Sequence, residues 1–578
     1  MFIPRPEHPR PQFQRKTWLN LNGLWEFEID NEKSSSEKGI LSKKKLDKEI
    51  IVPFCPESKL SGIEHTDFMH CVWYAKDFEM PEQWHKNRIL LHFGAVDYKT
   101  QIWINGEYVG QHTGGYTSFY FDITDKLHQH NRIMIRVEDD VRSADQPSGK
   151  QSQSFLSSGC MYTRTTGIWQ TVWLEAVGQN YLKNIKLYPD IQNTGIGINL
   201  FPYKVINNCI CRLTAYYHEK CVGRAEVTLS STSPYVYISL TEKHLWELGQ
   251  GRLYDLKLDL IENEQVIDTV YSYFGLRDIA LDDKAFYLNG KKIFGRWVLD
   301  QGYYPEGIYT APSDEALKND ILYGLQLGFN GARLHEKVFE ERYLYHADKI
   351  GYMVWGEYPN WGYFATQENV NIYANEWIEA IQRDFNHPSI IGWCPFNETW
   401  EKDDGTMQSK STIELIYKIT KIMDHSRPVI DTSGNYHTTT DIFDVHDYEQ
   451  NPEIFTRNYE QAANKIVLDQ IERTNRRIHQ KYTGGPLFIS EYGGIQWNTN
   501  GNSGWGYGDA PKTEEEFLRR YKELTNSLLQ NENIMGFCYT QLYDIEQEIN
   551  GLMTYNRIFK FKPEMIRQIN IQKAAIEE

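Results

Sequence analysis

Several features are scarce in this 578-residue sequence, and each absence excludes a class of protein. Basic residues are outnumbered: 61 Lys and Arg against 78 Asp and Glu give a formal net charge of -17. This balance argues against nucleic acid or an anionic membrane as the main partner. No apolar run is long enough to span a bilayer, and the proline-rich start MFIPRPEHPRPQF lacks the apolar segment of a signal peptide. We therefore expect a cytoplasmic protein.

Paired cysteine motifs are also missing. The eight cysteines include no CxxC pair, and the neighbours Cys209 and Cys211 lack the second pair that would complete a zinc site. Reduced, mostly buried thiols are expected, with no metal and no other cofactor. Aromatic residues, by contrast, are plentiful at 14%. This composition suits surfaces that stack on sugar rings, although buried packing is the commoner use of aromatic side chains.

The chain is longer than one hydrophobic core supports, so roughly two to four domains are expected. Residues 1–179 contain short alternating strands and turns such as Asn105-Gly106, which predicts a jelly-roll β-sandwich. Residues 180–277 repeat the alternation over the length of an immunoglobulin-like β-sandwich. Within the first of these segments, Asp140 to Thr166 is a long polar loop that carries Tyr162. Such loops are usually functional or disordered, and we expect this one to cover the mouth of the next domain.

Residues 278–578 change to an alternation of apolar strands and helical patterns, which predicts a TIM (β/α)8 barrel. The eight strand candidates are Ile293 to Leu299, Phe329 to Leu334, Tyr352 to Gly356, Ile390 to Phe396, Val429 to Thr432, Asp441 to His446, Leu487 to Ser490 and Met535 to Gln541. Among the helices, Ser313 to Leu327 opens with Ser313 as N-cap and with acidic residues in its first turn.

Two apolar strands of this barrel end in a glutamate. The run from Ile390 stops at Asn397 and Glu398, and the run from Pro486 delivers Glu491. A single glutamate in such a place is usually a helix cap or a solvated loop residue. Because the carboxyl ends of parallel strands meet on one face of a barrel, however, these two carboxylates are expected to converge on one substrate. Paired carboxylates indicate cleavage of a glycosidic bond.

The order of several motifs resembles glycoside hydrolase family 2, which contains β-galactosidases, β-glucuronidases and β-mannosidases. The similar blocks are WLNLNGLWEF, WINGEYVG, TGIWQTVWLE, NHPSIIGWCPFNET and ISEYGG, and they cover nearly the whole chain. The resemblance implies that Glu398 is the general acid/base and Glu491 the nucleophile. It further implies that Asn397 holds the sugar 2-hydroxyl and that Tyr448 hydrogen-bonds the nucleophile.

Further substrate-binding candidates lie at or just beyond predicted strand ends, where sugar hydroxyls need donors and acceptors. They are Asp300, Arg333, His335 and His446. Arg333 has a structural alternative, since a buried arginine can instead fix a carboxylate such as Glu491. The sequence departs from the family where relatives read Arg-x-Ser-His, and in the last strand, where a Trp is replaced by CYTQ. Trp361 and Trp505 are therefore the candidates for the sugar platform.

These observations predict a retaining exo-glycosidase that acts on a terminal β-linked sugar of a glycoside or oligosaccharide. A carbohydrate-binding protein without turnover is the rival reading. We expect a neutral galacto-configured sugar, because Glu548 stands where similar glucuronidases carry Asn-x-Lys before a glycine, and its charge would repel a uronate. β-Glucuronidase, β-galacturonidase and α-L-arabinopyranosidase remain alternatives, since Arg333 or Lys337 could serve a carboxylate. A homo-oligomer is left open.

Overall fold

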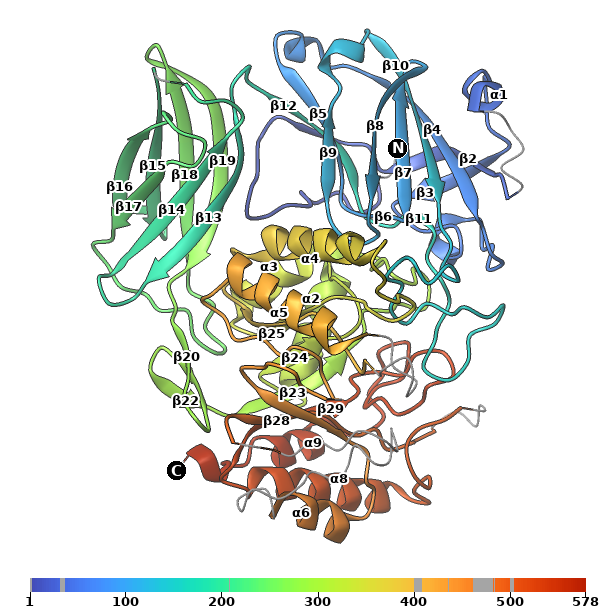
Figure 1. Ribbon diagram of the computed structural model, residues 1–578, viewed down its shortest axis with the longest axis vertical. Coiled ribbons are helices and arrows are strands. Elements are labelled where there is room, and N and C mark those ends of the chain that lie inside the picture. The colour runs from blue at the N-terminus through green and yellow to red at the C-terminus, as the bar shows by residue number, and fades with distance from the viewer. Residues whose placement is uncertain are drawn as a thin grey trace.

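The computed structural model describes residues 3–31, 37–206, 208–399, 408–434, 436–460, 482, 484–498 and 504–577. Figure 1 shows two β-sandwiches side by side in the upper half of the view and a barrel with surrounding helices below them. In the described ranges, no helix is long and apolar enough to cross a membrane. All eight cysteines are free thiols, and six of them are buried.

The N-terminal part packs a four-stranded sheet and a six-stranded sheet face to face, with a short two-stranded ribbon beside them. The four-stranded sheet contains, in order, β1 (Trp18–Asn20), β12 (Val172–Val177), β5 (Arg88–Phe93) and β9 (Phe119–Asp122). The six-stranded sheet contains β3 (Lys48–Val52), β2 (Gly23–Ile29), β4 (Cys71–Glu79), β10 (His130–Glu138), β7 (Lys99–Ile104) and β8 (Glu107–Thr113). The ribbon pairs β6 (Val96–Asp97) with β11 (Gly167–Ile168), and the helix α1 spans Glu37–Leu41. Ile133, Ile135 and Val137 of β10 enter the core because alternate side chains of a strand share a face.

The second part is a sandwich of three and four antiparallel strands, the seven-strand count of an immunoglobulin-like domain. One sheet contains β13 (Leu182–Asp190), β14 (Gly195–Pro202) and β17 (Tyr235–Ser239). The other contains β16 (Lys220–Thr228), β15 (Cys209–Tyr217), β18 (Leu253–Glu262) and β19 (Gln265–Gly275). A small sheet of β20 (Ile279–Leu281), β21 (Phe286–Leu288) and β22 (Lys291–Ile293) leads into the barrel.

The third part is the predicted barrel. Its parallel sheet runs in the order β26 (Ile390–Cys394), β25 (Met353–Glu357), β24 (Gly331–Leu334), β23 (Gly295–Asp300), β29 (Ile534–Thr540), β28 (Leu487–Gly493) and β27 (Phe443–Asp447). The helices are α2 (Asp314–Gln326), α3 (Glu341–Ile350), α4 (Val370–Asp384), α5 (Lys410–Met423), α6 (Pro452–Glu460), α8 (Glu514–Leu529) and α9 (Pro563–Asn570). Ser313 caps α2 as predicted, since its side chain accepts a hydrogen bond from the Ala316 backbone N–H.

Most predicted barrel strands differ from the structure by one to three residues at their ends, and one differs more. The first strand begins at Gly295, because Ile293 pairs within the small sheet that precedes it. The candidate at 429–432 does not form a continuous strand. It touches the sheet only through isolated parallel bridges, Trp393 with Val429 and Asn397 with Ser433. Between those bridges, the Thr432 backbone N–H donates to the side chain of Asp431, which interrupts the ladder.

Candidate active site

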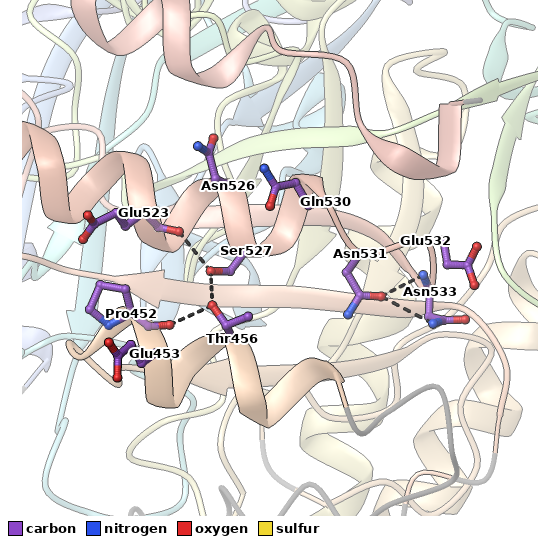
Figure 2. Close-up of a pocket in the computed structure, with 10 residues that line it drawn as sticks. All are labelled: Pro452, Glu453, Thr456, Glu523, Asn526, Ser527, Gln530, Asn531, Glu532 and Asn533. Carbon is purple, nitrogen blue, oxygen red and sulfur yellow. Dashed lines mark hydrogen bonds between the residues drawn. The ribbon is translucent and has the colours of Figure 1, made fainter.

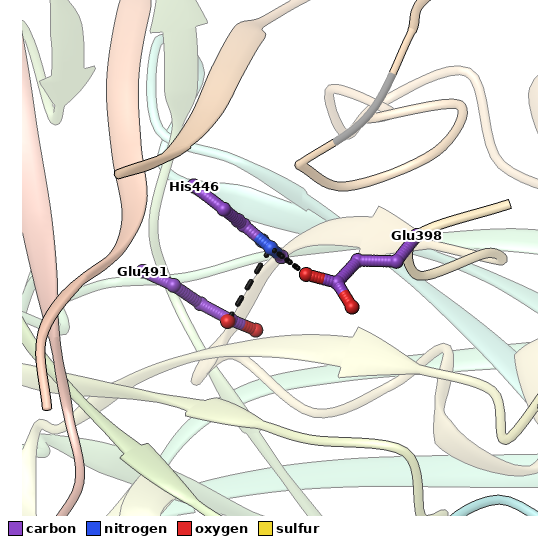
Figure 3. Close-up of side chains that lie close together, drawn as sticks. All are labelled: Glu398, His446 and Glu491. Atoms are coloured by element: carbon purple, nitrogen blue, oxygen red, sulfur yellow. Dashed lines mark hydrogen bonds and ion pairs between the residues drawn. The ribbon is translucent and has the colours of Figure 1, made fainter. Parts of the chain in front are cut away.

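The two predicted carboxylates meet at the carboxyl end of the barrel strands. Glu398 follows β26 and Glu491 lies in β28, while His446 of β27 lies between them (Figure 3). His446 Nδ1 is 2.7 Å from Glu398 Oε1 and 3.3 Å from Glu491 Oε2. One oxygen of each glutamate and one histidine nitrogen all lie within 4.8 Å of one another. The convergence expected from two strand ends is therefore present.

Glu491 is buried among hydrogen-bond donors. Arg333 Nη1 donates to its Oε1 at 2.9 Å, and the Tyr448 hydroxyl donates to its Oε2. Burial by itself would raise the pKa of Glu491. Its contacts with His446 and Arg333 lower the pKa by a larger amount, to about 2. This side chain is therefore held as a carboxylate, which is the state that a nucleophile requires.

Glu398 has a different setting. Its side chain is partly exposed, and its contact with His446 is the hydrogen bond described above. Its backbone has φ of 44°, a left-handed conformation that non-glycine residues adopt rarely, and its N–H donates to the Ser433 carbonyl at 2.9 Å. Strain of this kind persists only where the surroundings enforce it, and it clusters at functional sites.

Arg333 organises the floor of the site. Besides Glu491, it donates to the Asn397 side-chain oxygen at 2.7 Å and to Glu357 at the end of β25. The structural alternative considered for Arg333 is therefore present, because its guanidinium orients protein groups. With its oxygen occupied, Asn397 has a buried Nδ2 without a hydrogen-bond partner among the described residues. That N–H group is available to a sugar hydroxyl.

The remaining candidates from the sequence separate into two groups. His335 lies near the pair, with Nε2 3.9 Å from Glu491 Oε1 and Nδ1 3.1 Å from Glu357. Burial lowers the pKa of His335, and Arg333 lowers it further, which favours a neutral ring. Asp300 is buried at the end of β23, where it accepts hydrogen bonds from Gly302 and Tyr543. None of its contacts within the described chain reaches the two carboxylates.

The two tryptophans proposed as sugar platforms both contact the site's margin. Trp361 is half-buried, and its indole N–H donates to the Asn397 carbonyl at 3.1 Å. Trp505 donates to the carbonyl of Gly159, in the long loop of the N-terminal domain. It also contacts Tyr507, which stacks on Tyr448 with ring centroids 3.4 Å apart.

Sequence reasoning missed several supporting residues. Asn360 holds Asn397 reciprocally, by accepting from its backbone N–H at 2.7 Å and donating to its carbonyl at 3.1 Å. Tyr507 supports the ring of Tyr448. Asn360 follows β25 in the run EYPNW, so its place after a strand end could have revealed it. Tyr507 lies in the loop after β28 and had no comparable pattern.

The N-terminal domain reaches the barrel through the segment between β10 and β11, as expected for Asp140 to Thr166. The backbone N–H groups of Ser148 and Gly149 donate to the Trp361 carbonyl at 2.9 and 3.0 Å. Farther along, the hydroxyl of Tyr162 donates to Glu548. The loop therefore packs against the carboxyl end of the barrel.

Glu398, His446 and Glu491 are also the group of described residues whose spacing could hold a metal ion. In the structure, Arg333 and Tyr448 donate hydrogen bonds to the two oxygens of Glu491, so both oxygens already have partners. A separate polar pocket lies between α6 and α8, where Thr456 and Ser527 hydrogen-bond at 2.6 Å (Figure 2). None of the candidates from the sequence lines it.

The family becomes clear when the chain is compared with known proteins. The sugar binding domain of glycosyl hydrolases family 2 matches residues 19–175, a further domain of that family matches residues 216–277, and its TIM barrel domain matches residues 279–531. The chain therefore belongs to glycoside hydrolase family 2.

Relatives within the family carry different names. A β-galactosidase of Thermoanaerobacter pseudethanolicus is 25% identical over 75% of this chain and 55% of its own length. A putative β-glucuronidase of Formosa agariphila is 27% identical over 61% of this chain and 44% of its own length. The chain thus spans about half the length of these relatives. A solved Ruminococcus gnavus β-glucuronidase in complex with D-glucuronic acid superposes with a TM-score of 0.79 at 17% identity, covering 97% of this chain and 99% of that one.

Proposed function

We propose that this protein is a retaining exo-glycosidase that removes a terminal β-linked sugar by double displacement. The separation of Glu398 and Glu491 carries the proposal, because oxygens of the two carboxylates lie within 4.8 Å of each other. Retaining glycosidases hold their carboxyl groups about 5 to 5.5 Å apart, whereas inverting enzymes need about 6.5 to 9.5 Å to admit a water molecule.

In the first step, Glu491 attacks the anomeric carbon while Glu398 donates its proton to the departing oxygen. This forms a glycosyl ester and releases the aglycone. In the second step, Glu398 takes a proton from water, the water oxygen attacks the anomeric carbon, and Glu491 leaves as a carboxylate. Arg333 and Tyr448 stabilise that carboxylate before and after the ester exists. Asn397 would donate its free N–H to the sugar 2-hydroxyl.

For the sugar itself, we propose a neutral galacto-configured ring. The two cations considered for a substrate carboxylate are already engaged. Arg333 holds Glu357, Glu491 and Asn397, and Lys337 donates to the carbonyls of Gly302 and Tyr309 at 2.6 and 2.8 Å. A uronate would therefore lack a free partner from either residue. A β-uronide is the second candidate, favoured by the names of several relatives, and an α-L-arabinopyranoside has the same ring without C6.

The test combines a substrate panel with active-site labelling. Nitrophenyl β-galactoside, α-L-arabinopyranoside, β-glucuronide and β-galacturonide are compared by kcat/KM, and a 2-fluoro analogue of the best substrate is used to trap the intermediate. We expect a neutral sugar to be preferred and the peptide containing Glu491 to carry the label. Glu491→Gln should lower turnover by ~10⁴-fold or more. A uronide preferred by more than about tenfold, or ~1.4 kcal/mol, would overturn the neutral sugar, and a label elsewhere would overturn the nucleophile.

A further inference from the structure

Lys150, in the loop that the N-terminal domain extends to the barrel, is a mostly buried cation with no anionic partner among the described residues. It is 7% exposed, and no described residue forms a hydrogen bond or ion pair with its Nζ. Its Nζ lies 3.9 Å from the ring centroid of Trp361. Its Nζ is not one of the fully buried side-chain atoms that lack a hydrogen-bond partner, so the ammonium is accessible and can donate to a ligand.

The backbone around Lys150 is fixed by hydrogen bonds on both sides. Ser148 and Gly149 donate to the Trp361 carbonyl, and the Tyr162 N–H donates to the Lys150 carbonyl at 2.8 Å. Trp361 in turn donates to the Asn397 carbonyl. One aromatic ring therefore links the ammonium to the residue that precedes Glu398, which places Lys150 at the edge of the catalytic pair.

The charges that act on Lys150 come from the same place. Burial lowers the pKa of Lys150, whereas Cys160, followed by Glu548, Glu398 and Glu491, raises it by a larger amount, so the side chain stays charged. None of these carboxylates lies within ion-pair distance of its Nζ among the pairs found in the described chain. Tyr162 joins Lys150 to one of these carboxylates, because its backbone N–H donates to the Lys150 carbonyl at 2.8 Å and its hydroxyl donates to Glu548.

Glu548 is the buried acceptor in this arrangement. It is 3% exposed, and its oxygens accept from the Tyr162 hydroxyl and, at 2.9 Å, from Asn550 Nδ2. Burial raises the pKa of Glu548, whereas Lys150 lowers it. Each carboxylate oxygen has a further lone pair, so both can still accept a hydrogen bond from a ligand.

We propose that Lys150 and Glu548 together bind hydroxyl groups of the terminal sugar, Lys150 as donor and Glu548 as acceptor. A hydroxyl is both donor and acceptor, so a cation and an anion a short distance apart satisfy it without leaving a net charge. A uronate would instead place a second negative charge beside Glu548. This assignment deepens the proposed function and rests on it, and it makes the N-terminal domain part of the sugar site.

The decisive experiment measures whether the loss of kcat/KM in Lys150→Met depends on one particular hydroxyl of the sugar. Wild type and variant are compared by kcat/KM on nitrophenyl β-galactoside and on its 3-deoxy, 4-deoxy and 6-deoxy analogues. Methionine keeps the length and packing of the side chain. We expect Lys150→Met to lower kcat/KM on the galactoside by about 10- to 100-fold. On the analogue that lacks the contacted hydroxyl, the same substitution should lower kcat/KM by less than about 3-fold, as in a double-mutant cycle.

A uniform loss across all analogues, or no loss, would show that Lys150 does not read a hydroxyl. A loss confined to the β-galacturonide would reassign it to a carboxylate and overturn the proposal. Glu546→Gln is the matched control: this neighbouring carboxylate accepts from the Thr163 backbone N–H at 3.1 Å, and the variant should keep the wild-type pattern. Labelling of Glu491 by the 2-fluoro sugar is measured in parallel. If wild type is not labelled, the proposed function has failed, independently of Lys150.

Discussion

At the scale of single residues, the two catalytic candidates differ in the number of donors that surround them. Glu491 is buried and receives hydrogen bonds from Arg333 and Tyr448. Glu398 is partly exposed and contacts His446. A carboxylate that accepts several hydrogen bonds, some from a cation, becomes less basic. The family resemblance gave the two glutamates different roles, and their surroundings differ accordingly.

The role of Glu398 as general acid predicts a dependence on the leaving group. Protonation matters only when the departing oxygen is a poor leaving group. In Glu398→Gln, turnover of disaccharides should therefore fall by ~10² to 10⁴-fold, and turnover of dinitrophenyl glycosides should fall much less. Azide should restore turnover on the activated substrates, because it needs no base to attack the glycosyl ester. Steady-state rates with and without azide check this. Equal losses on both classes of substrate, with no effect of azide, would contradict the role.

At the scale of elements, the barrel uses each strand end to deliver a side chain. β24 supplies Arg333, β27 supplies His446, and β28 supplies Glu491, while the turn after β26 supplies Glu398. Apolar runs that end in a polar residue predicted all four positions. The interruption of the strand at 429–432 was not predicted. The Thr432 backbone N–H donates to the Asp431 side chain instead of the sheet, and strand propensity does not reveal such competition for a backbone donor.

The cap of α2 allows a stability test at this scale. The Ser313 side chain accepts the Ala316 backbone N–H at 3.2 Å, so Ser313→Ala should lower the free energy of unfolding by ~1 kcal/mol. Ser313→Asp keeps an acceptor at the N-terminus of the helix and should change the free energy of unfolding by only a few tenths of a kcal/mol. Urea unfolding followed by circular dichroism measures both. An alanine variant as stable as the wild type would show that the cap contributes nothing.

At the scale of the whole molecule, ionic contacts join parts that are far apart in sequence. Arg15 donates to Glu175 in the first sandwich at 2.8 Å and to Asp268 in the second at 2.9 Å. Arg5 donates to Glu340 of the barrel at 2.9 Å. Because these groups are buried, each pair is stable only while both partners remain, and the loss of one partner leaves an uncompensated charge.

Two largely buried histidines beside Glu175, His8 and His92, each with Nε2 3.8 Å from a carboxylate oxygen, predict a fall in stability at mildly acidic pH. Burial lowers the pKa of His92 to about 3 and that of His8 to about 4. Both are therefore neutral when folded but gain a proton when unfolded below their ordinary pKa of about 6.5. The unfolded state then binds more protons, so stability decreases as the pH falls from about 6.5 toward 4.

The measurement is the urea midpoint of the N-terminal transition between pH 7 and 4. In His92→Gln, the free energy of unfolding should change with pH by ~1 to 3 kcal/mol less over that range than in wild type, because glutamine does not titrate. His128→Gln is the control, since that imidazole lies in the surface turn before β10. An unchanged pH dependence in His92→Gln would contradict the assignment.

The sequence alone was enough to predict the order of the three parts, the barrel strands and the two glutamates at their ends. Those features depend on periodicity and on local motifs, which short stretches of sequence encode. The tertiary structure was needed to show that Arg333 is committed to protein groups, that Glu398 has a left-handed backbone, and that Tyr162 joins Lys150 to Glu548. These features depend on contacts between segments hundreds of residues apart, and their geometry comes from packing that no local pattern records.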